Sequence, residues 1–183
     1  KKISEELTIR AERDLLTGLY NKETTRVLIE EELENQPESV SALMVLDLDN
    51  FKQINDELGH FCGDKVLAQV ASKLSSQFRT SDIIGRIGGD EFAVLLIEQA
   101  EGDVLRTAEC ILEAIRAPFP LQEGEARISS SVGVAFHSLE AATPARLLKN
   151  ADVAMYRAKG EGRDRLWRYR PSTFTDSGYG RVF

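Results

Sequence analysis

Two short acidic stretches of the sequence combine residue types that could do chemistry together. Asp47 and Asp49 end an apolar run, and Asp90 and Glu91 follow two glycines. Carboxylates held close together raise one another's pKa and cost stability unless a cation compensates them. Mg²⁺ or Mn²⁺ suits such oxygen ligands, and Mg²⁺ typically takes one or two carboxylates plus phosphate oxygens of its substrate. The residues therefore predict a metal-dependent nucleotide site, at which the glycines let a ligand approach the backbone.

Hydrophobic periodicity predicts the elements that must position these residues. Helices are expected over residues 3–16, 21–35, 50–58, 64–79, 103–117 and 144–159. Strands are expected over residues 41–47, 82–87, 91–97, 126–136 and 166–169. Asn21 and Thr143 are the expected N-caps of the second and last helices. The glycines and Asp90 occupy the expected hairpin turn between the second and third strands.

This element order contains the β-α-β-β-α-β pattern of ferredoxin-like folds, with one helix and one strand added. We therefore expect an α+β domain with a central antiparallel sheet and flanking helices, as in nucleotidyl cyclases and polymerase palm domains. In that topology the first strand lies between the third and fourth strands. Asp47 then lies beside the hairpin that carries Asp90 and Glu91, so carboxylates distant in sequence meet at one edge of the sheet.

Composition narrows the function further. The 183 residues, 42% of them hydrophobic, suffice for one well-packed domain. The longest apolar runs are strand-sized and no secretory signal is visible at the start, so we expect a cytoplasmic chain. A net charge of −7 argues against a nucleic-acid partner held through a broad basic face. Cys62 and Cys110 have no paired spacing and are expected to be reduced thiols.

Five sequence blocks in order resemble the GGDEF-domain diguanylate cyclases. The motif that gives the family its name is present at residues 88–92 as Gly-Gly-Asp-Glu-Phe. The other blocks lie at residues 14–21, 47–56, 59–64 and 151–163. The resemblance implies a catalytic domain over residues 14–170, preceded by a signalling helix at 1–13 and followed by a tail at 171–183. It also implies an upstream sensor in a longer protein, which could attach that protein to a membrane.

The resemblance implies an activity and a metal site. Family members condense two GTP molecules into cyclic di-GMP and two pyrophosphates, with one GTP on each of two domains in a homodimer. The implied metal ligands are Asp47, the backbone carbonyl of Leu48, and Asp90, for Mg²⁺ or Mn²⁺ with two ions in each active site. Asp90 and Asp47 are then catalytic through the metal, and Glu91 assists the metal or helps to deprotonate the attacking hydroxyl.

The resemblance also implies the GTP ligands. Asn55 and Asp64 would read guanine, because their groups match that base and would be mispaired with adenine. The triphosphate would be met by two groups of residues: the backbone near Phe51, and the side chains of Lys52, Lys159 and Arg163. Gly88 and Gly89 would lie against the bound nucleotide.

A second ligand site is implied by an Arg-x-x-Asp pattern just before the hairpin. Arg79 and Asp82 occupy the positions of the family's inhibitory motif. An arginine can bind a phosphate or a guanine edge with two hydrogen bonds, and an aspartate can accept from guanine. The pattern therefore predicts feedback inhibition by cyclic di-GMP.

Each of these residues also has a purely structural interpretation. Asp64 could be the N-cap of the long helix, and Asn55 could mark the end of the helix before it. Lys159 and Arg163 lie where cations favour a helix dipole. The alternative function is a catalytically silent GGDEF domain that senses GTP or cyclic di-GMP and regulates a partner. An ATP-using cyclase or a palm-type polymerase is disfavoured, because neither needs both Asn55 and Asp64.

Overall fold

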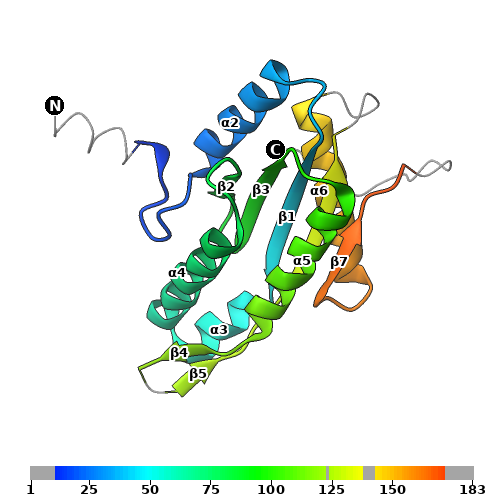
Figure 1. Cartoon of the computed structure of the whole chain (residues 1–183). Helices are drawn as coiled ribbons and strands as arrows, with labels where there is room; N and C mark the ends of the chain where they lie inside the picture. The colour runs from blue at the N-terminus through cyan, green and yellow to red at the C-terminus, as the bar shows by residue number, and fades with distance from the viewer. Residues whose placement is uncertain (1–10, 123, 138–142, 172–183) are drawn as a thin grey trace, which may run out of the picture.

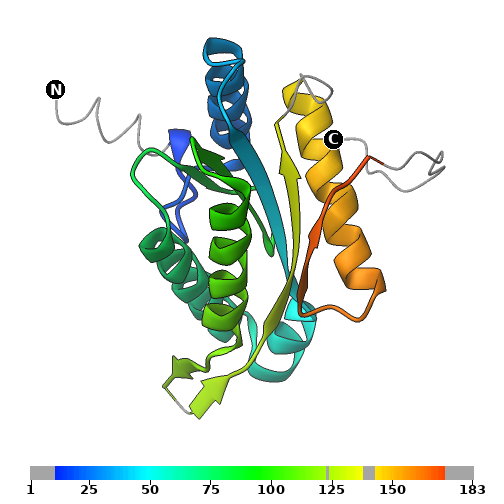
Figure 2. The ribbon, with the colours of Figure 1, turned by 45° about the vertical axis from the view of Figure 1, so that its right-hand side comes forward.

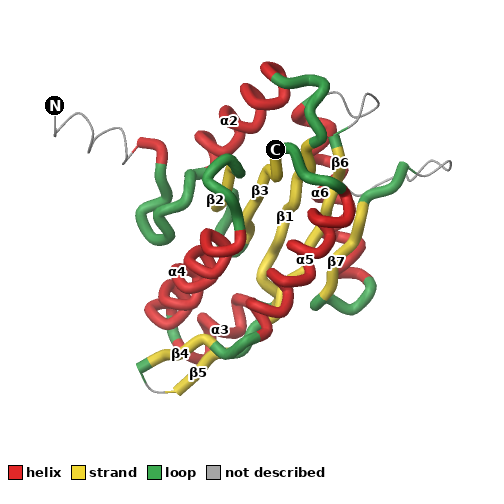
Figure 3. Tube along the Cα trace, in the orientation of Figure 1, coloured by secondary structure: helices red, strands yellow, loops and turns green. Residues whose placement is uncertain are grey.

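The sheet that carries the site is five-stranded. In the computed structural model, which describes residues 11–122, 124–137 and 143–171, it contains β1 (Ser41–Asp49), β2 (Ile83–Arg86), β3 (Glu91–Ile97), β6 (Ser129–Phe136) and β7 (Arg165–Arg168). The order across the sheet is β2-β3-β1-β6-β7, as Figure 3 shows by colouring the strands yellow. β1 pairs antiparallel with both β3 and β6, whereas β7 joins β6 in parallel. The predicted α+β fold and its central strand are therefore confirmed, with a parallel strand at one edge.

Helices cover both faces of this sheet. On one face lie α2 (Lys22–Asn35) and α6 (Pro144–Gly160), and on the other lie α3 (Phe51–Leu58), α4 (His60–Gln77) and α5 (Glu101–Arg116). Figure 1 looks onto the α4 and α5 face, with α6 behind the sheet. Among the described residues, no helix combines the length and apolar character needed to span a bilayer.

β1 is the buried centre of the fold. All nine of its residues are buried, because helices cover it on both sides. Leu46 and Leu48 pack in the cluster beneath α4 and α5, and Leu43 and Val45 pack in the cluster beneath α2 and α6. Side chains alternate along a strand, so Asp47 and Asp49 belong to the α2 and α6 face. The two aspartates of one motif therefore share a face at the end of the central strand.

A glycine brings α6 unusually close to the sheet. A Cβ on Gly133 of β6 would lie 2.1 Å from the backbone carbonyl oxygen of Ala151 and 2.2 Å from the nitrogen of Met155. Any larger residue would push the helix away. The close approach fixes the position of α6, and with it the basic residues near the end of that helix.

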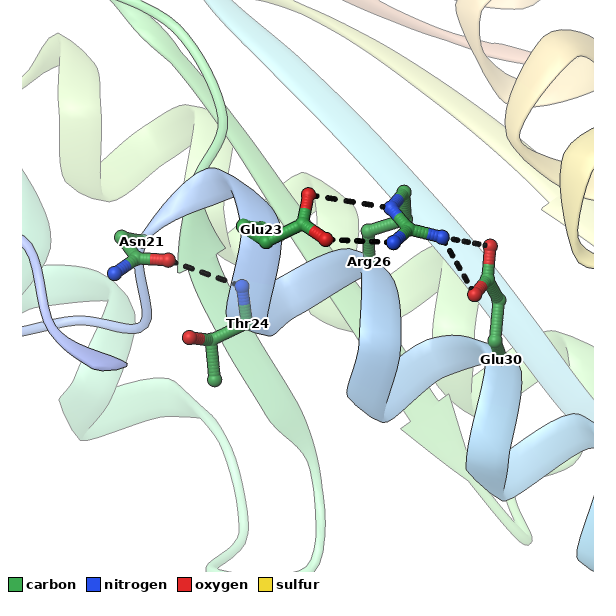
Figure 4. A network of polar contacts seen from close by, with 5 residues as sticks. All are labelled: Asn21, Glu23, Thr24, Arg26 and Glu30. Carbon is green, nitrogen blue, oxygen red and sulfur yellow. Dashed lines mark hydrogen bonds and ion pairs between the residues drawn. The ribbon is translucent and has the colours of Figure 1, made fainter. Parts of the chain in front are cut away.

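Helix α2 begins where the sequence predicted, directly after the N-cap Asn21. The Asn21 side chain accepts a hydrogen bond from the backbone N–H of Thr24, as expected of an N-cap (Figure 4). On its exposed surface Arg26 lies between Glu23 and Glu30, at 2.6 Å and 2.7 Å (Figure 4). Such exposed pairs contribute little stability, so the cap and the buried residues Ile29 and Leu33 hold the helix in place.

Two predicted helix boundaries were wrong. The first helix does not reach Leu16, because Asp14 accepts hydrogen bonds from the backbone and hydroxyl of Thr17 and turns the chain; its predicted residues 3–10 lie outside the described residues. The long helix begins at His60 and not at Asp64, since Gly59 alone separates it from α3 with a φ of 83°. Asp64 is therefore not an N-cap.

The strand predicted over residues 126–136 is two strands. β5 (Gly124–Ala126) pairs with β4 (Phe119–Leu121) in a separate small hairpin, and only β6 joins the main sheet. This hairpin was missed because each strand has three residues, too few for a periodic signal. The last helix begins behind Thr143 as predicted, with the Thr143 side chain accepting from the N–H of Arg146.

Candidate nucleotide and metal site

Asp47 is the centre of the predicted metal site. It lies near the end of β1 directly opposite Glu91 of β3, and the N–H of Leu48 donates to the carbonyl of Asp90 at 3.1 Å. On its other side, the Lys159 ammonium lies 2.9 Å from Asp47 Oδ1. The structure thus brings Asp47, Asp90 and Glu91 to one edge of the sheet, as the topology predicted, and adds Lys159 to them.

The electrostatics of Asp47 are those of a carboxylate short of positive charge. Burial and repulsion from Asp90 and Glu91 raise the pKa of its carboxyl, Lys159 offsets only part of this shift, and the net value is about 6. A side chain that is only 9% exposed has little water to compensate its charge. A cation bound at this edge would supply what is missing.

The donor set fits a hard divalent cation. Asp47, Asp90 and the Leu48 carbonyl offer two carboxylates and one carbonyl oxygen, which is the kind of partial set that Mg²⁺ completes with water and phosphate oxygens. Within the described ranges, no group of three or more histidine, cysteine, aspartate or glutamate side chains is arranged to hold a metal by itself. The site therefore suits a metal that arrives with a phosphorylated ligand.

The hairpin turn is shaped by its neighbours. A Cβ on Gly88 would lie 2.5 Å from Glu91 Oε2, so the space beside this glycine is filled by the protein's own carboxylate. Gly89 is exposed and has no atom within 4 Å of a Cβ position. Of the two predicted glycines, only Gly89 therefore leaves open space for a ligand.

Arg86 is a residue that sequence reasoning missed. Its guanidinium donates to the Gly89 carbonyl at 2.7 Å and 3.1 Å, and to both carboxylate oxygens of Asp14 at 3.2 Å. It thereby ties the hairpin turn to the loop that follows the first helix. Seventy-two residues separate Arg86 from Asp14, and no local pattern in the sequence could have signalled the pair.

The two predicted guanine readers lie on adjacent helices. Asn55 belongs to α3, and its side chain occupies the space beside Gly63 of α4, where a Cβ would lie 1.9 Å from Asn55 Oδ1. That same Cβ would lie 3.2 Å from the ring of Phe51, which is buried at the start of α3. Asp64 follows Gly63 directly and is exposed. Gly63 therefore sets the position of Asn55 next to Asp64.

The three basic side chains predicted to bind phosphate differ in their exposure and in their partners. Lys52 is exposed in the first turn of α3, and Lys159 is half-buried against Asp47. Arg163 is exposed in the loop after α6, and among the described residues no hydrogen bond or ion pair engages its guanidinium. Lys52 and Arg163 therefore present cationic groups to solvent, whereas the Lys159 ammonium is paired with the Asp47 carboxylate.

Asp49 has a role different from that of Asp47. Its carboxylate accepts hydrogen bonds from Ser129 Oγ at 2.7 Å, from Ser131 Oγ at 2.6 Å and from the backbone N–H of Asp164 at 3.0 Å. These bonds satisfy the carboxylate of a residue that is only 5% exposed. Asp49 thus joins β1 to β6 and to the loop after α6, and it is not a further member of the charged cluster around Asp47.

The predicted inhibitory motif lines an open pocket of about 400 Å³. The Asp82 carboxylate is buried and already accepts from the N–H groups of Arg79 and Ile97, at 2.9 Å and 3.2 Å. Gln99 Nε2 lies 3.4 Å from both of its oxygens. Asp82 therefore fixes the turn, while the exposed Arg79 side chain is available to a ligand; Arg106 of α5 also lines the pocket but pairs with Asp103.

Comparison with known proteins shows the family of the chain. The family profile described as "Diguanylate cyclase, GGDEF domain" matches residues 11–165, so the chain is a member of the GGDEF-domain family. It is 43% identical over 161 residues to diguanylate cyclase TpbB of Pseudomonas aeruginosa strain UCBPP-PA14, covering 86% of this chain and 37% of TpbB. The chain thus spans less than half the length of that relative.

Two further comparisons bear on the activity. The GGDEF domain of DgcB from Caulobacter crescentus, solved in complex with c-di-GMP, matches with a TM-score of 0.83 and 28% identity, covering 88% of this chain and 94% of the DgcB chain. Cyclic di-GMP phosphodiesterase PdeR of Escherichia coli K12 is 33% identical over 171 residues, covering 93% of this chain and 26% of PdeR. The same domain therefore occurs in proteins named for synthesis and for breakdown of cyclic di-GMP.

Proposed function

We propose that this domain is a diguanylate cyclase, which condenses two GTP molecules into cyclic di-GMP and two pyrophosphates. The observation that carries the proposal is the buried Asp47 carboxylate, placed beside Asp90 and Glu91 and paired with Lys159 at 2.9 Å. A divalent cation and the phosphates that it carries would compensate this unfavourable buried charge, as the condensation of GTP requires.

The proposed chemistry assigns a part to each group. The 3′-hydroxyl of each GTP attacks the α-phosphorus of the other in two successive steps. In each step a P–O bond forms, the bond to one pyrophosphate breaks, and the hydroxyl loses its proton; the first step joins the nucleotides and the second closes the ring. Asp47, Asp90 and the Leu48 carbonyl would hold Mg²⁺ or Mn²⁺, which neutralises developing charge on the phosphates when it is bound. Lys52, Lys159 and Arg163 would stabilise the departing pyrophosphate, and Glu91 would accept the proton.

Two domains are needed for this reaction. Each site holds one GTP, and the two nucleotides must present hydroxyl and phosphorus to each other along the line of attack. A homodimer with its sites facing each other supplies that geometry, and an upstream sensor that changes the pairing would control the rate. Cyclic di-GMP would bind back at Arg79 in the pocket beside Asp82 and inhibit the enzyme.

The test is product formation from GTP. The purified domain with Mg²⁺ is expected to convert GTP, and not ATP, into cyclic di-GMP, with a rate that rises more steeply than linearly with protein concentration. Asp90→Ala should abolish turnover and leave the fold intact, whereas Arg79→Ala should keep the activity and lose the inhibition by added product. An Asp90→Ala variant with wild-type turnover would contradict the metal assignment.

The second candidate is a silent domain that binds GTP or cyclic di-GMP and regulates a partner. The similarity to PdeR, which is named as a phosphodiesterase, supports this second candidate. Fusing a dimeric coiled coil ahead of residue 11 separates the two, because it removes weak pairing as a cause of inactivity. Nucleotide binding without product in that fusion would establish the silent domain.

A further inference from the structure

The loop after α6 is held in a conformation that its residues do not favour. Gly162, Arg163 and Asp164 are consecutive and have φ angles of 112°, 63° and 48°. Left-handed backbone is unfavourable for residues with a Cβ, and two such residues in a row persist only where the surroundings impose them. The loop therefore needs external restraints.

Those restraints converge on Asp164. Its backbone N–H donates to Asp49 at 3.0 Å, and its carboxylate accepts from Arg116 Nε at 2.8 Å. Arg116 also donates to the Asp164 carbonyl at 3.1 Å. One residue is thus gripped at its amide, its side chain and its carbonyl by groups from the ends of β1 and α5.

The anchor on the β1 side is rigid. Asp49 is buried, and Ser129 and Ser131 of β6 fix its carboxylate with bonds of 2.7 Å and 2.6 Å. Asp49 follows Asp47 by two residues on the same face of the strand. Figure 2 shows the loop between α6 and β7 at the end of the sheet where β1 passes into α3. The loop is therefore fixed relative to the carboxylates of the proposed active site.

Arg163 is the residue that this arrangement leaves free. Its N–H donates to the Ala158 carbonyl and its carbonyl accepts from Arg165, so its backbone is held on both sides. Its exposed guanidinium engages no partner in the described part of the chain. A side chain kept unpaired on a fully restrained backbone is one whose position matters to a ligand.

We propose that Asp49, Arg116 and Asp164 form a clamp that positions Arg163 for the triphosphate of bound GTP. These three are positioning residues, since they act through Arg163 and do not touch the substrate themselves. The clamp rests on the proposed function, because that function supplies the triphosphate. The clamp goes beyond that function because it makes phosphate binding depend on Arg116, a residue of α5 that lies outside all of the family motifs.

The experiment compares two probes by titration calorimetry with Mg²⁺. The α,β-methylene analogue of GTP carries the full triphosphate, and GMP lacks its outer two phosphates. Arg116→Ala should weaken binding of the analogue about tenfold and leave GMP within about twofold, because a displaced cation loses its phosphate bonds while base recognition persists. Asp164→Asn, which removes the charge that Arg116 binds, should act in the same direction.

Two controls make the test specific. Arg116 and Arg127 line one cavity beside Asp49. Arg127 forms an exposed ion pair with Glu125 and, among the described residues, no hydrogen bond to the loop after α6. Arg127→Ala should therefore leave both affinities unchanged. In an Arg163→Ala background, Arg116→Ala should cause no further loss, since the clamp acts only through Arg163.

The outcomes separate the clamp from the proposed function. Wild-type protein that fails to bind the analogue overturns both. Wild-type binding with unchanged affinity in Arg116→Ala and Asp164→Asn overturns the clamp alone. Equal losses for both probes, or an additive loss in the Arg163→Ala background, would show a general structural effect and also overturn the clamp. Thermal unfolding of each variant identifies any that fail to fold, and the Asp164→Asn result then decides.

Discussion

At the scale of single residues, Asp47 shows how the site departs from what stability alone would favour. A carboxylate so deeply buried normally has hydrogen bonds or counter-charges that compensate its lost hydration, as Asp49 has from two serines and a backbone amide. Asp47 instead has one lysine and two acidic neighbours. Of two aspartates on one face of one strand, Asp49 therefore stabilises the fold through its hydrogen bonds, whereas Asp47 is left in surroundings that disfavour its charge.

This contrast predicts that Asp47→Asn stabilises the metal-free domain. The folded pKa of about 6 exceeds the ordinary 3.8, so the folded state binds more protons between these values and stability falls as pH rises through this window. Above pH 6 the ionised group costs on the order of 1 to 3 kcal/mol, which the substitution removes. Chemical denaturation at pH 7.5 with a chelator should show the gain.

The control for Asp47→Asn is Asp56→Asn, the same change of charge at an exposed position of α3. It should leave the free energy of unfolding within about 0.5 kcal/mol. The stability of Asp47→Asn should also vary less than that of wild type between pH 4 and pH 6. A metal-free Asp47→Asn domain that is less stable than wild type would show that the Lys159 pair outweighs the repulsion.

A second prediction at this scale concerns Gly63. In a helix interior, Gly→Ala usually stabilises by about 0.5 to 1 kcal/mol. Here the added methyl would overlap Asn55 Oδ1 at 1.9 Å and press on Phe51, so the amide must leave its place. Gly63→Ala should therefore raise the KM for GTP at least tenfold, roughly the loss of one well-made base contact.

The matched variant is Gly102→Ala in the first turn of α5, where a Cβ meets no atom within 4 Å. That variant should gain a few tenths of a kcal/mol and keep the wild-type KM. If Gly63→Ala also keeps its KM, Asn55 does not read the base from the position seen here.

At the scale of elements, the sequence predicted what depends on local periodicity and missed what depends on contacts between distant segments. The strand β1, the caps Asn21 and Thr143 and the approach of Asp47 to the hairpin follow from run lengths, capping residues and topology. The start of α4 was misplaced because a single glycine, Gly59, breaks the chain between two helices. Arg86 was missed because its partners lie in loops remote in sequence or across the turn.

The missed arginine leads to a prediction for the hairpin. Burial raises the pKa of the Asp14 carboxyl, but hydrogen bonds from Thr17 and the charge of Arg86 outweigh it and lower the pKa overall. The Asp14 charge therefore stabilises the fold above its ordinary pKa of 3.8, and this contribution is lost as pH falls through the lower folded value. Arg86→Ala should reduce stability at pH 7 by about 1 to 2 kcal/mol, and less at pH 3.

Arg86→Ala should also slow turnover, since the Gly89 carbonyl loses both donors and the turn that carries Asp90 becomes mobile. We expect kcat to fall at least tenfold. Arg26→Ala is the control, because Arg26 also bridges two acidic partners but lies on the exposed face of α2. A variant with reduced stability and wild-type kcat would limit Arg86 to a structural role.

At the scale of the whole molecule, the two helical layers carry different groups of the proposed site on opposite faces of one sheet. α6 carries Lys159 on one face, and α3 and α4 carry Asn55 and Asp64 on the other. A nucleotide that reaches both must extend around the end of β1, at the edge of the domain. A site at an edge is open to a second domain, which is what the condensation of two nucleotides requires.

The need for two competent sites can be measured by mixing. Wild-type domain fused to a dimeric coiled coil is combined with an equal amount of the same fusion carrying Asp90→Ala, and the subunits are allowed to exchange. Random pairing leaves about one quarter of the dimers with two intact sites. If both sites must present GTP, cyclic di-GMP synthesis at constant total protein falls to about a quarter of the wild-type rate. If one intact site suffices, mixed dimers also work and the rate stays at half or above, which would contradict the face-to-face mechanism.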